Sequence, residues 1–266
     1  MGARWTKEEE QKYREELLHL YVEENKPIKE IGSILGIAEQ TVFQRMQRLE
    51  IASTPERKLN YVARRRSDVA IPNKRTPGLA EFFGIMLGDG RLAPYQIVVT
   101  LGTKEIEYVE HVASLMYNLF AIKPKIGVRK NGFRDIYLGS LDLVEWFLQE
   151  GLVHNKVQAQ VDMPAWLFEK DEYMERFLRG FFDTDGSIYK LRFGTQLSFT
   201  NKSQPLLQSI RKVLFILQYH PSSINSNIRF YLTRKEEILR FFKEIKPANS
   251  KHQRRFQEFF SGQVVP

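Results

Sequence analysis

Apolar residues recur with a helical period in three segments at the start of the chain. Between residues 6 and 24 they lie on one side of a charged helix that Thr6 would cap. A second helix is expected over residues 28–35, ended by Gly36, and a third over residues 39–50. The short turn between the last two helices is typical of a helix-turn-helix.

The third of these helices would present a polar face to the major groove of DNA. Its candidate contact residues carry carboxylate, amide, hydroxyl or guanidinium groups: Glu39, Gln40, Thr41, Gln44, Arg45 and Arg48. The alternative is a three-helix bundle that binds another protein. Because the chain nearby is basic, we predict that residues 1–52 form a helix-turn-helix DNA-binding module.

The helical period disappears between residues 53 and 78. This segment contains seven basic residues, among them Arg64, Arg65 and Arg66, but only two acidic residues. A charged run is most often a solvated tether. Between two candidate DNA-binding modules, however, it is also expected to follow the phosphate backbone as a basic linker.

From residue 79 onwards the chain contains an internal repeat. Residues 99–104 match residues 197–202, and each half should contain a helix, a β-hairpin, a second helix, a second hairpin and a closing helix. The halves are about residues 79–165 and 166–260. We therefore predict an α+β domain over residues 79–266, made of two αββαββα repeats related by a pseudo-two-fold axis.

Strand residues of the second half alternate between apolar and polar side chains, so one face of the sheet should be polar. That face would carry Arg192, Gln196, Ser198, Arg229 and Tyr231. The opposite, apolar face would carry Leu191, Phe193, Leu197 and Phe199. A polar face can simply be solvated, but alternating guanidinium and amide groups also suit the recognition of base edges in a major groove. The matching face of the first half is less basic.

Composition narrows the class of protein. The chain has 266 residues with 40 Lys and Arg against 32 Asp and Glu, giving a net charge of +8 and a pI near 9.5, which favour a polyanionic partner. The absence of cysteine excludes disulfides, zinc ribbons and thiol catalysis. No apolar run reaches transmembrane length and no signal peptide is visible. We therefore expect no membrane association and an intracellular location: cytoplasmic, nucleoid-associated or, in a eukaryote, organellar.

The two repeats contain closely similar helix ends. Residues 82–92 are Phe-Phe-Gly-Ile-Met-Leu-Gly-Asp-Gly-Arg-Leu, and residues 178–189 are Leu-Arg-Gly-Phe-Phe-Asp-Thr-Asp-Gly-Ser-Ile-Tyr. Each helix is expected to stop at its Asp-Gly pair, with the glycine in the left-handed conformation. Small residues four positions apart would leave a bare face on each helix, where another backbone can approach closely. These residues are Gly84 and Gly88 in the first helix, and Gly180 and Thr184 in the second.

If the bare faces pack together, Asp89 and Asp185 come to lie side by side. Two carboxylates at helix C-termini repel each other and the helix dipoles. A hard divalent cation between them reverses both costs, because Mg²⁺ prefers carboxylate and carbonyl oxygens. One Asp-Gly pair would be an ordinary turn, but two matched copies favour a metal site.

These helix ends resemble the two signature helices of LAGLIDADG homing endonucleases, in the single-chain form with two motifs. The resemblance covers about residues 79–260, and the first copy departs from it at Leu87, where an acidic residue often lies. It implies a saddle-shaped fold with an antiparallel DNA-binding sheet. It also implies that Asp89 and Asp185 hold Mg²⁺ or Mn²⁺, together with the backbone carbonyls of Gly88 and Thr184.

Further catalytic residues follow from the same resemblance. Lys156 and Lys251 match the basic residue that reaches back to the cleavage centre, where a lysine could stabilise charge on the phosphate. Asn201 and Thr103 match the polar residue at a hairpin end that orients water. In so basic a chain, the alternative for each lysine is a solvent-exposed side chain without a catalytic role.

The resemblance implies a site-specific double-strand DNA endonuclease of the homing type. It would act as a monomer with internal pseudo-symmetry on a long, asymmetric DNA target. Two alternatives stay open: a transcription regulator that has lost cleavage, and an RNA maturase that assists intron splicing. The two intact aspartates argue against the first, while the polar sheet face and the helix-turn-helix favour duplex DNA over the second.

Overall fold

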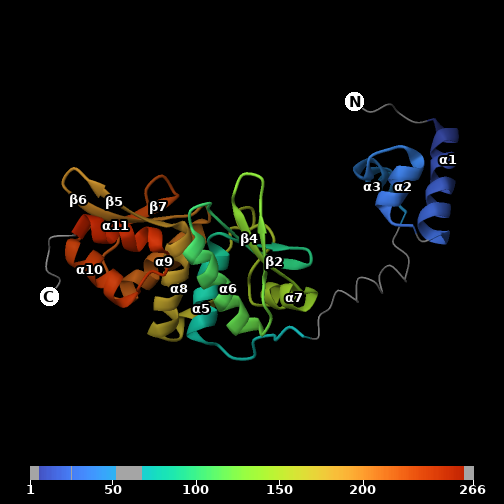
Figure 1. Ribbon diagram of the computed structural model, residues 1–266. Helices are drawn as coiled ribbons and strands as arrows, with labels where there is room; N and C mark the ends of the chain where they lie inside the picture. Colours follow the sequence, from blue (N-terminus) through green and yellow to red (C-terminus); the bar gives the residue numbers. More distant parts are fainter. Residues whose placement is uncertain (1–5, 25, 52–67, 261–266) are drawn as a thin grey trace. The chain divides into compact units, whose positions relative to one another are not determined.

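Figure 1 shows a computed structural model that describes residues 6–24, 26–51 and 68–260. The chain divides into two compact units, residues 1–63 and 64–266. In the described part of the chain, no helix is both long and apolar enough to cross a membrane. Arg64, Arg65 and Arg66, which are predicted to contact DNA, lie outside the described residues.

The first unit contains helices in the order expected from the sequence. They are α1 (Lys7–Leu18), which continues as the π-helix η1 (His19–Glu23), α2 (Ile28–Leu35) and α3 (Glu39–Arg48). Thr6 caps α1 by accepting a hydrogen bond from the backbone N–H of Glu9, and Gly36 ends α2 in the left-handed conformation at φ 64°. Ile31 and Val42 meet in the small core that holds the helices together.

The predicted DNA-facing side of α3 is accessible to solvent. Its exposed or half-buried side chains are Glu39, Gln40, Thr41, Gln44, Arg45 and Arg48. The guanidinium of Arg45 also lies 4.3 Å from the ring centroid of Tyr13 in α1. A cation–π contact of this kind holds the arginine against its own unit, because the ring face attracts the positive charge.

The second unit begins with a complete αββαββα repeat (Figure 1). Its elements are α5 (Pro77–Leu87), β1 (Gly90–Ala93), β2 (Gln96–Leu101), α6 (Ile106–Phe120), β3 (Lys125–Val128), β4 (Arg134–Gly139) and α7 (Leu141–Gln149). The strands form one antiparallel sheet in the order β1-β2-β4-β3. This repeat confirms the order of elements predicted from the sequence.

The second repeat has a smaller sheet. Its elements are η2 (Ala165–Phe168), α8 (Asp171–Asp185), β5 (Gly186–Leu191), β6 (Gly194–Thr200), α9 (Gln204–Ile216), β7 (Arg229–Leu232), α10 (Lys235–Glu244) and α11 (Ser250–Phe260). The strands are antiparallel in the order β5-β6-β7, and the predicted second hairpin is reduced to β7 and one bridge between Asn225 and Arg229. Ser226 and Asn227 adopt positive φ values of 50° and 57°, as in a tight hairpin turn. Before this turn the chain still follows β7, since Ser222 donates its backbone N–H to the carbonyl of Tyr231 at 2.9 Å.

Helices α5 and α8 lie side by side at the centre of the second unit, with one sheet on either side (Figure 1). Glycine permits this contact, because a Cβ atom on Gly84 would lie 2.2 Å from the carbonyl oxygen of Phe177. A Cβ atom on Gly180 would likewise lie 2.0 Å from the carbonyl oxygen of Glu81. The predicted packing of the two bare helix faces is confirmed, since a larger residue at either position would force the backbones apart.

Both signature helices end without a left-handed glycine, so that prediction was wrong. Helix α5 stops at Leu87, and α8 runs through Asp185 to Gly186, whose φ of −88° is ordinary. The chain passes from each helix almost directly into a strand. Glycine is needed there for space: a Cβ atom on Gly90 would lie 2.4 Å from the Cα of Met86, and one on Gly186 would lie 2.2 Å from the ring of Phe182.

The turn between β5 and β6 extends beyond the core of the second repeat. Leu197 and Phe199 are buried as predicted, but Leu191 is 46% exposed and Phe193 is 89% exposed. Arg192 lies in the turn and not in a strand, and its guanidinium is 5.0 Å from the ring centroid of Phe193. Alternation predicts the side of a strand on which a residue lies, but not whether that side is covered.

Candidate active site

The joined ends of α5 and α8 bring Asp89 and Asp185 into one largely buried centre. A Cβ atom on Gly88 would lie 2.0 Å from the hydroxyl oxygen of Thr184 and 3.6 Å from the carboxyl carbon of Asp185. Burial, and then the neighbouring Asp89, raise the pKa of Asp185 to about 6. Burial also raises the pKa of Asp89. The protein alone therefore disfavours the doubly ionised form of this pair.

Lys156 lies at the negative end of α5. Its Nζ donates hydrogen bonds to the carbonyl oxygens of Met86 at 2.9 Å and Leu87 at 3.1 Å, and also to that of Gly88. These carbonyls end the helix and lack partners within it, so the ammonium acts as a C-terminal cap. Burial lowers the pKa of Lys156 to about 8, although Asp185 and Asp89 oppose this shift.

Asn201 fixes the orientation of Asp185. Its Nδ2 donates to Oδ2 of Asp185 at 2.7 Å, and its Oδ1 accepts from the backbone N–H of Ser203 at 2.9 Å. The residue predicted to orient water thus binds the carboxylate directly. Thr103, the matching residue of the first repeat, is exposed, and its backbone carbonyl accepts from Arg134 at 2.8 Å.

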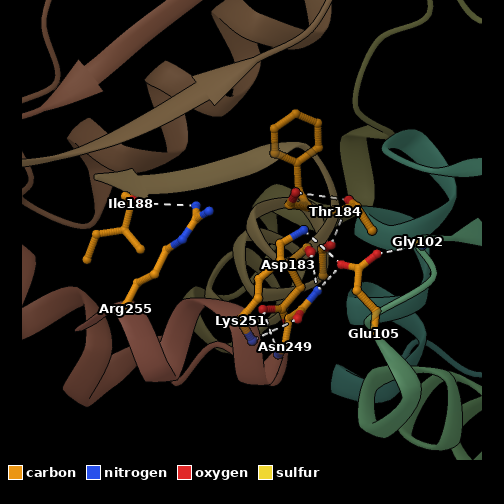
Figure 2. Close-up of polar contacts among 10 residues, drawn as sticks. Gly102, Glu105, Asp183, Thr184, Ile188, Asn249, Lys251 and Arg255 are labelled. Atoms are coloured by element: carbon orange, nitrogen blue, oxygen red, sulfur yellow. Dashed lines mark hydrogen bonds and ion pairs between the residues drawn. The ribbon is translucent and has the colours of Figure 1, made fainter. Parts of the chain in front are cut away.

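Lys251 forms a contact that crosses from the second repeat to the first (Figure 2). Its Nζ donates to Oε1 of Glu105 at 2.8 Å, and the same oxygen accepts from Nδ2 of Asn249 at 2.7 Å. Burial alone would raise the pKa of Glu105, but the hydrogen bonds from Lys251 and Asn249 hold it below its ordinary value. The charge of Glu105 in turn helps to raise the pKa of Asp89.

Sequence reasoning missed Glu105 and its amide partner. Glu105 directly follows the repeated segment 99–104, but no motif marks a glutamate at that position. Asn249 lies in a short connection before α11 that has no periodicity. Their proximity depends on how the two repeats dock, and nothing in either local sequence encodes that.

Asp183 lies at the position where the two signature motifs differ, since the first motif has Leu87 there. Its carboxylate accepts hydrogen bonds from the backbone N–H groups of Ala248 at 2.7 Å and Asn249 at 3.0 Å. Burial raises the pKa of Asp183 to about 7 against the effect of those bonds. Asp183 therefore holds the connection that carries Lys251, while the corresponding Leu87 is a buried apolar residue.

The predicted DNA-facing residues of the second sheet have different environments. Arg229 is exposed, Tyr231 is half-buried, and Gln196 donates to the hydroxyl of Tyr189. Ser198 is only 3% exposed, which argues against the predicted base contact. It lies in the central strand, paired with Tyr231 on one side, so its short hydroxyl is covered by neighbours on the same face.

The corresponding face of the first sheet carries a closed polar network. Arg129 donates to the two carboxylate oxygens of Asp135 at 2.8 and 2.7 Å, and to the hydroxyl of Thr100 at 3.1 Å. Thr100 itself donates to Asp135 at 2.6 Å. The positive charge of this arginine is therefore largely neutralised within the protein.

The donor set at the helix ends fits a hard cation. Among the described residues, no group of three or more His, Cys, Asp or Glu side chains could hold a metal. Asp89 and Asp185 nevertheless offer two carboxylates, the oxygen ligands that Mg²⁺ prefers. Of the two predicted backbone ligands, the carbonyl of Gly88 accepts a hydrogen bond from Lys156, so a cation would share this oxygen with the ammonium. The backbone carbonyl of Thr184 stays a predicted ligand.

Residues 172–246 match a family model described as the LAGLIDADG-like domain. The chain contains a LAGLIDADG-like domain. The matched residues run from the start of α8 to the end of α10 and include Asp183 and Asp185. The match thus covers the second signature helix, and the first repeat has the same order of helices and strands except for β3, which has no counterpart among the matched elements.

Curated proteins with related sequences match little more than half of the chain. The replication factor C small subunit of Methanocaldococcus jannaschii is 26% identical over 154 residues, which are 58% of this chain and 8% of that protein. A DNA polymerase of Thermococcus hydrothermalis is 24% identical over 167 residues, 59% of this chain and 10% of that protein. The chain therefore corresponds to a tenth or less of the length of these relatives.

Solved structures of LAGLIDADG proteins are similar at low sequence identity. The N-terminal LAGLIDADG domain of DUF199/WhiA is 21% identical with a TM-score of 0.47, covering 66% of this chain and 86% of that one. I-DmoI in complex with DNA and Ca is 18% identical with a TM-score of 0.47, covering 64% and 89%. The homing endonuclease I-WcaI on its DNA recognition sequence is 15% identical with a TM-score of 0.49, covering 77% and 95%.

Proposed function

We propose that this chain is a site-specific DNA endonuclease that hydrolyses phosphodiester bonds in both strands. The observation that carries the proposal is the pair of buried carboxylates, Asp89 and Asp185, at the joined ends of α5 and α8. Their ionised form is disfavoured by burial and mutual repulsion, which a structural turn does not require. A protein keeps such an arrangement at the expense of stability, and perturbed carboxylates of this kind cluster at functional sites.

Asp89 and Asp185 would hold Mg²⁺ or Mn²⁺. A bound ion would supply Lewis-acid stabilisation of the charge that develops on the phosphate. Asn201 fixes one oxygen of Asp185, so this carboxylate is already oriented before a ligand arrives. Lys156 and Lys251 place ammonium groups beside the two carboxylates. Once released from their partners within the protein, they would stabilise negative charge on a phosphate.

The DNA would lie across the polar faces of the two sheets, with Arg229 and Arg192 among its contacts. The net charge of +8 supports a polyanionic ligand. The two faces differ, because Arg229 is exposed whereas Arg129 is paired with Asp135. A single chain with two unequal halves would bind a long, asymmetric target as a monomer.

The first unit would extend the contact with DNA through α3. Its exposed polar face and the tight turn at Gly36 support a helix-turn-helix. Removal of residues 1–52 should shorten the protected DNA footprint and leave the cut positions unchanged. An unchanged footprint would assign this unit to protein binding.

The endonuclease proposal is tested with Asp89→Asn and Asp185→Asn, each assayed on a plasmid target that the parent protein selects from a randomised library. Both variants should lose cleavage in Mg²⁺ and in Mn²⁺, yet bind the same DNA within about tenfold of the parent. Asp171→Asn is the matched control, since Asp171 is exposed at the opposite end of α8. Retained cleavage in either active-site variant removes that residue from the centre.

The same assay separates the alternative functions. A parent protein that binds the selected target but cuts neither strand in either metal is a regulator. Tighter binding to a structured intron RNA than to any selected duplex would favour the maturase.

A further inference from the structure

Lys156 and Lys251 occupy corresponding positions but bind different partners. Lys156 donates to three carbonyls at the end of α5 in its own repeat, and it forms no ion pair with a described carboxylate. Lys251 instead donates to the carboxylate of Glu105 in the other repeat at 2.8 Å. The ammonium of Lys156 is thus held by uncharged carbonyl groups, whereas the ammonium of Lys251 is held by a full negative charge.

The difference arises at one position that the two repeats share. Glu105 is the N-cap residue of α6, and Ser203 is the N-cap residue of α9. Each reaches into the opposite repeat, because Ser203 donates its hydroxyl to the carbonyl of Val161 at 2.5 Å. A hydroxyl carries no charge, so only the first repeat can restrain a lysine in this way.

The carboxylate of Glu105 is fixed before DNA arrives (Figure 2). Its side chain is 13% exposed, and its Oε2 accepts from the backbone N–H of Gly102 at 2.6 Å. Asn249, which binds the other oxygen, is itself fixed by its backbone and side-chain bonds to Asp183. The pair between Glu105 and Lys251 therefore has a defined geometry and does not rest on two freely moving side chains.

We infer that Glu105 is a positioning residue that holds Lys251 back from the scissile phosphate and makes the cutting of the two DNA strands unequal. This inference rests on the proposed endonuclease function. The phosphate served by Lys251 must displace the carboxylate of Glu105, which also repels it, whereas the phosphate served by Lys156 competes only with uncharged carbonyl groups. The strand on the Lys251 side is cut second, and a nicked duplex accumulates between the two cuts.

The test compares Glu105→Gln with the parent on a supercoiled plasmid that carries the selected target, with each strand labelled separately. The amide keeps the shape of Glu105 but releases Lys251, so the slower cut should accelerate by about fivefold, the typical strength of a partly exposed ion pair. The faster cut should stay within about twofold. The nicked intermediate should become correspondingly scarce.

Glu107→Gln is the matched control. Glu107 lies on the same helix and faces Arg254 of the other repeat, but that contact is 3.8 Å long and both side chains are more than half exposed. The Glu107→Gln variant removes one negative charge, as Glu105→Gln does, but leaves the contact of Lys251 intact. Both cut rates should therefore match those of the parent. Lys251→Met should slow the second cut, and Glu105→Gln should then have no further effect. An unchanged ratio of the two rates in Glu105→Gln, or equal changes in both, overturns the inference.

Binding to a synthetic duplex in EDTA separates this inference from the proposed function. Release of Lys251 should tighten binding and steepen the slope of log K against log salt by up to about 0.9, the contribution of one phosphate contact. Lys251→Met should cancel the gain. If the parent cuts no DNA but this coupling is present, the restraint on Lys251 stands and the nuclease function fails. If the parent cuts both strands and the coupling is absent, the restraint fails and the nuclease function stands.

Discussion

The two repeats of the second unit use equivalent glycines to pack their central helices, but they use different residues to satisfy their polar groups. At the contact between α5 and α8, Gly84 and Gly180 play equivalent parts, because each allows the opposite backbone to approach. One turn further on, the first repeat has the apolar Leu87 where the second has Asp183. The two repeats therefore share the shape of the helix contact but differ in the charge that they carry one turn further on.

The difference shows which requirements act on both halves. A close helix pair needs space on both faces at once, so a single large residue on either helix would separate them. A polar connection needs only that its own donors and acceptors find partners, and different residues can supply these. Asp183 secures the connection before Lys251, while the corresponding connection in the first repeat has His154 bound to the carbonyl of Leu92 at 3.1 Å.

The largest effect is expected when the first repeat's residue replaces Asp183. In Asp183→Leu, the buried backbone N–H groups of Ala248 and Asn249 lose their acceptors, which should lower the free energy of unfolding by about 2–4 kcal/mol. Urea unfolding of the metal-free protein measures this loss. Asp183→Asn keeps one acceptor oxygen and should lose less. If Asp183→Leu leaves the free energy of unfolding unchanged, the carboxylate is not needed to hold this connection.

A smaller loss is expected for Lys156→Met. The variant leaves the carbonyls at the end of α5 without their charged donor, so unfolding should require about 1–2 kcal/mol less. Lys251→Met breaks only a partly exposed ion pair and should cost at most about 1 kcal/mol. Both values come from the same urea experiment. Equal losses would show that the two lysines are equivalent despite their different partners.

Asp185→Asn should stabilise the metal-free protein by about 1–2 kcal/mol at neutral pH. Because the folded state raises the pKa of Asp185 to about 6, the penalty of ionisation grows as pH rises from about 4, the unfolded value, and is complete above about 6. The advantage of the variant should therefore vanish on acidification. Melting curves in EDTA across this range measure it.

Metal addition supplies the control for that experiment. Mg²⁺ should raise the melting temperature of the parent more than that of Asp185→Asn, because ligand binding stabilises only a complete site. If Asp185→Asn melts below the parent in EDTA, its bond to Asn201 outweighs the repulsion, and Asp185 is a structural residue.

The smallest effects are expected on the sheet faces. Arg229→Ala should weaken DNA binding by several-fold and lower the salt slope by about 0.9, because an exposed arginine that contacts phosphate is lost. Asp135→Asn should do the opposite in the first repeat, because it frees Arg129 from its carboxylate partner. Titration of a synthetic duplex at several salt concentrations measures both. If the two variants change DNA affinity in opposite directions, the two sheet faces differ as described. If both change it in the same direction, the contrast is lost.

The sequence by itself determined most of the helices and strands and the position of the centre. Helical periods placed the helices, the four-residue spacing of small residues predicted that α5 and α8 pack, and their matched ends predicted that Asp89 and Asp185 meet. These features are local, since each depends on residues within a few turns of one helix. Local patterns also predicted the alternation in β6, where Leu197 and Phe199 are buried.

Tertiary structure decided the partners of the polar side chains. Lys251 meets Glu105 across 146 positions of sequence, and Lys156 meets the carbonyls of α5 across about 70. Tertiary structure also buries Ser198 and exposes Phe193. The alternation of side chains had placed Ser198 on the polar, solvated face and Phe193 on the apolar, covered face. A hydrogen bond requires two atoms within about 3 Å, and a sequence period specifies a direction but no such distance. Only the docking of one repeat on the other brings these atoms into contact.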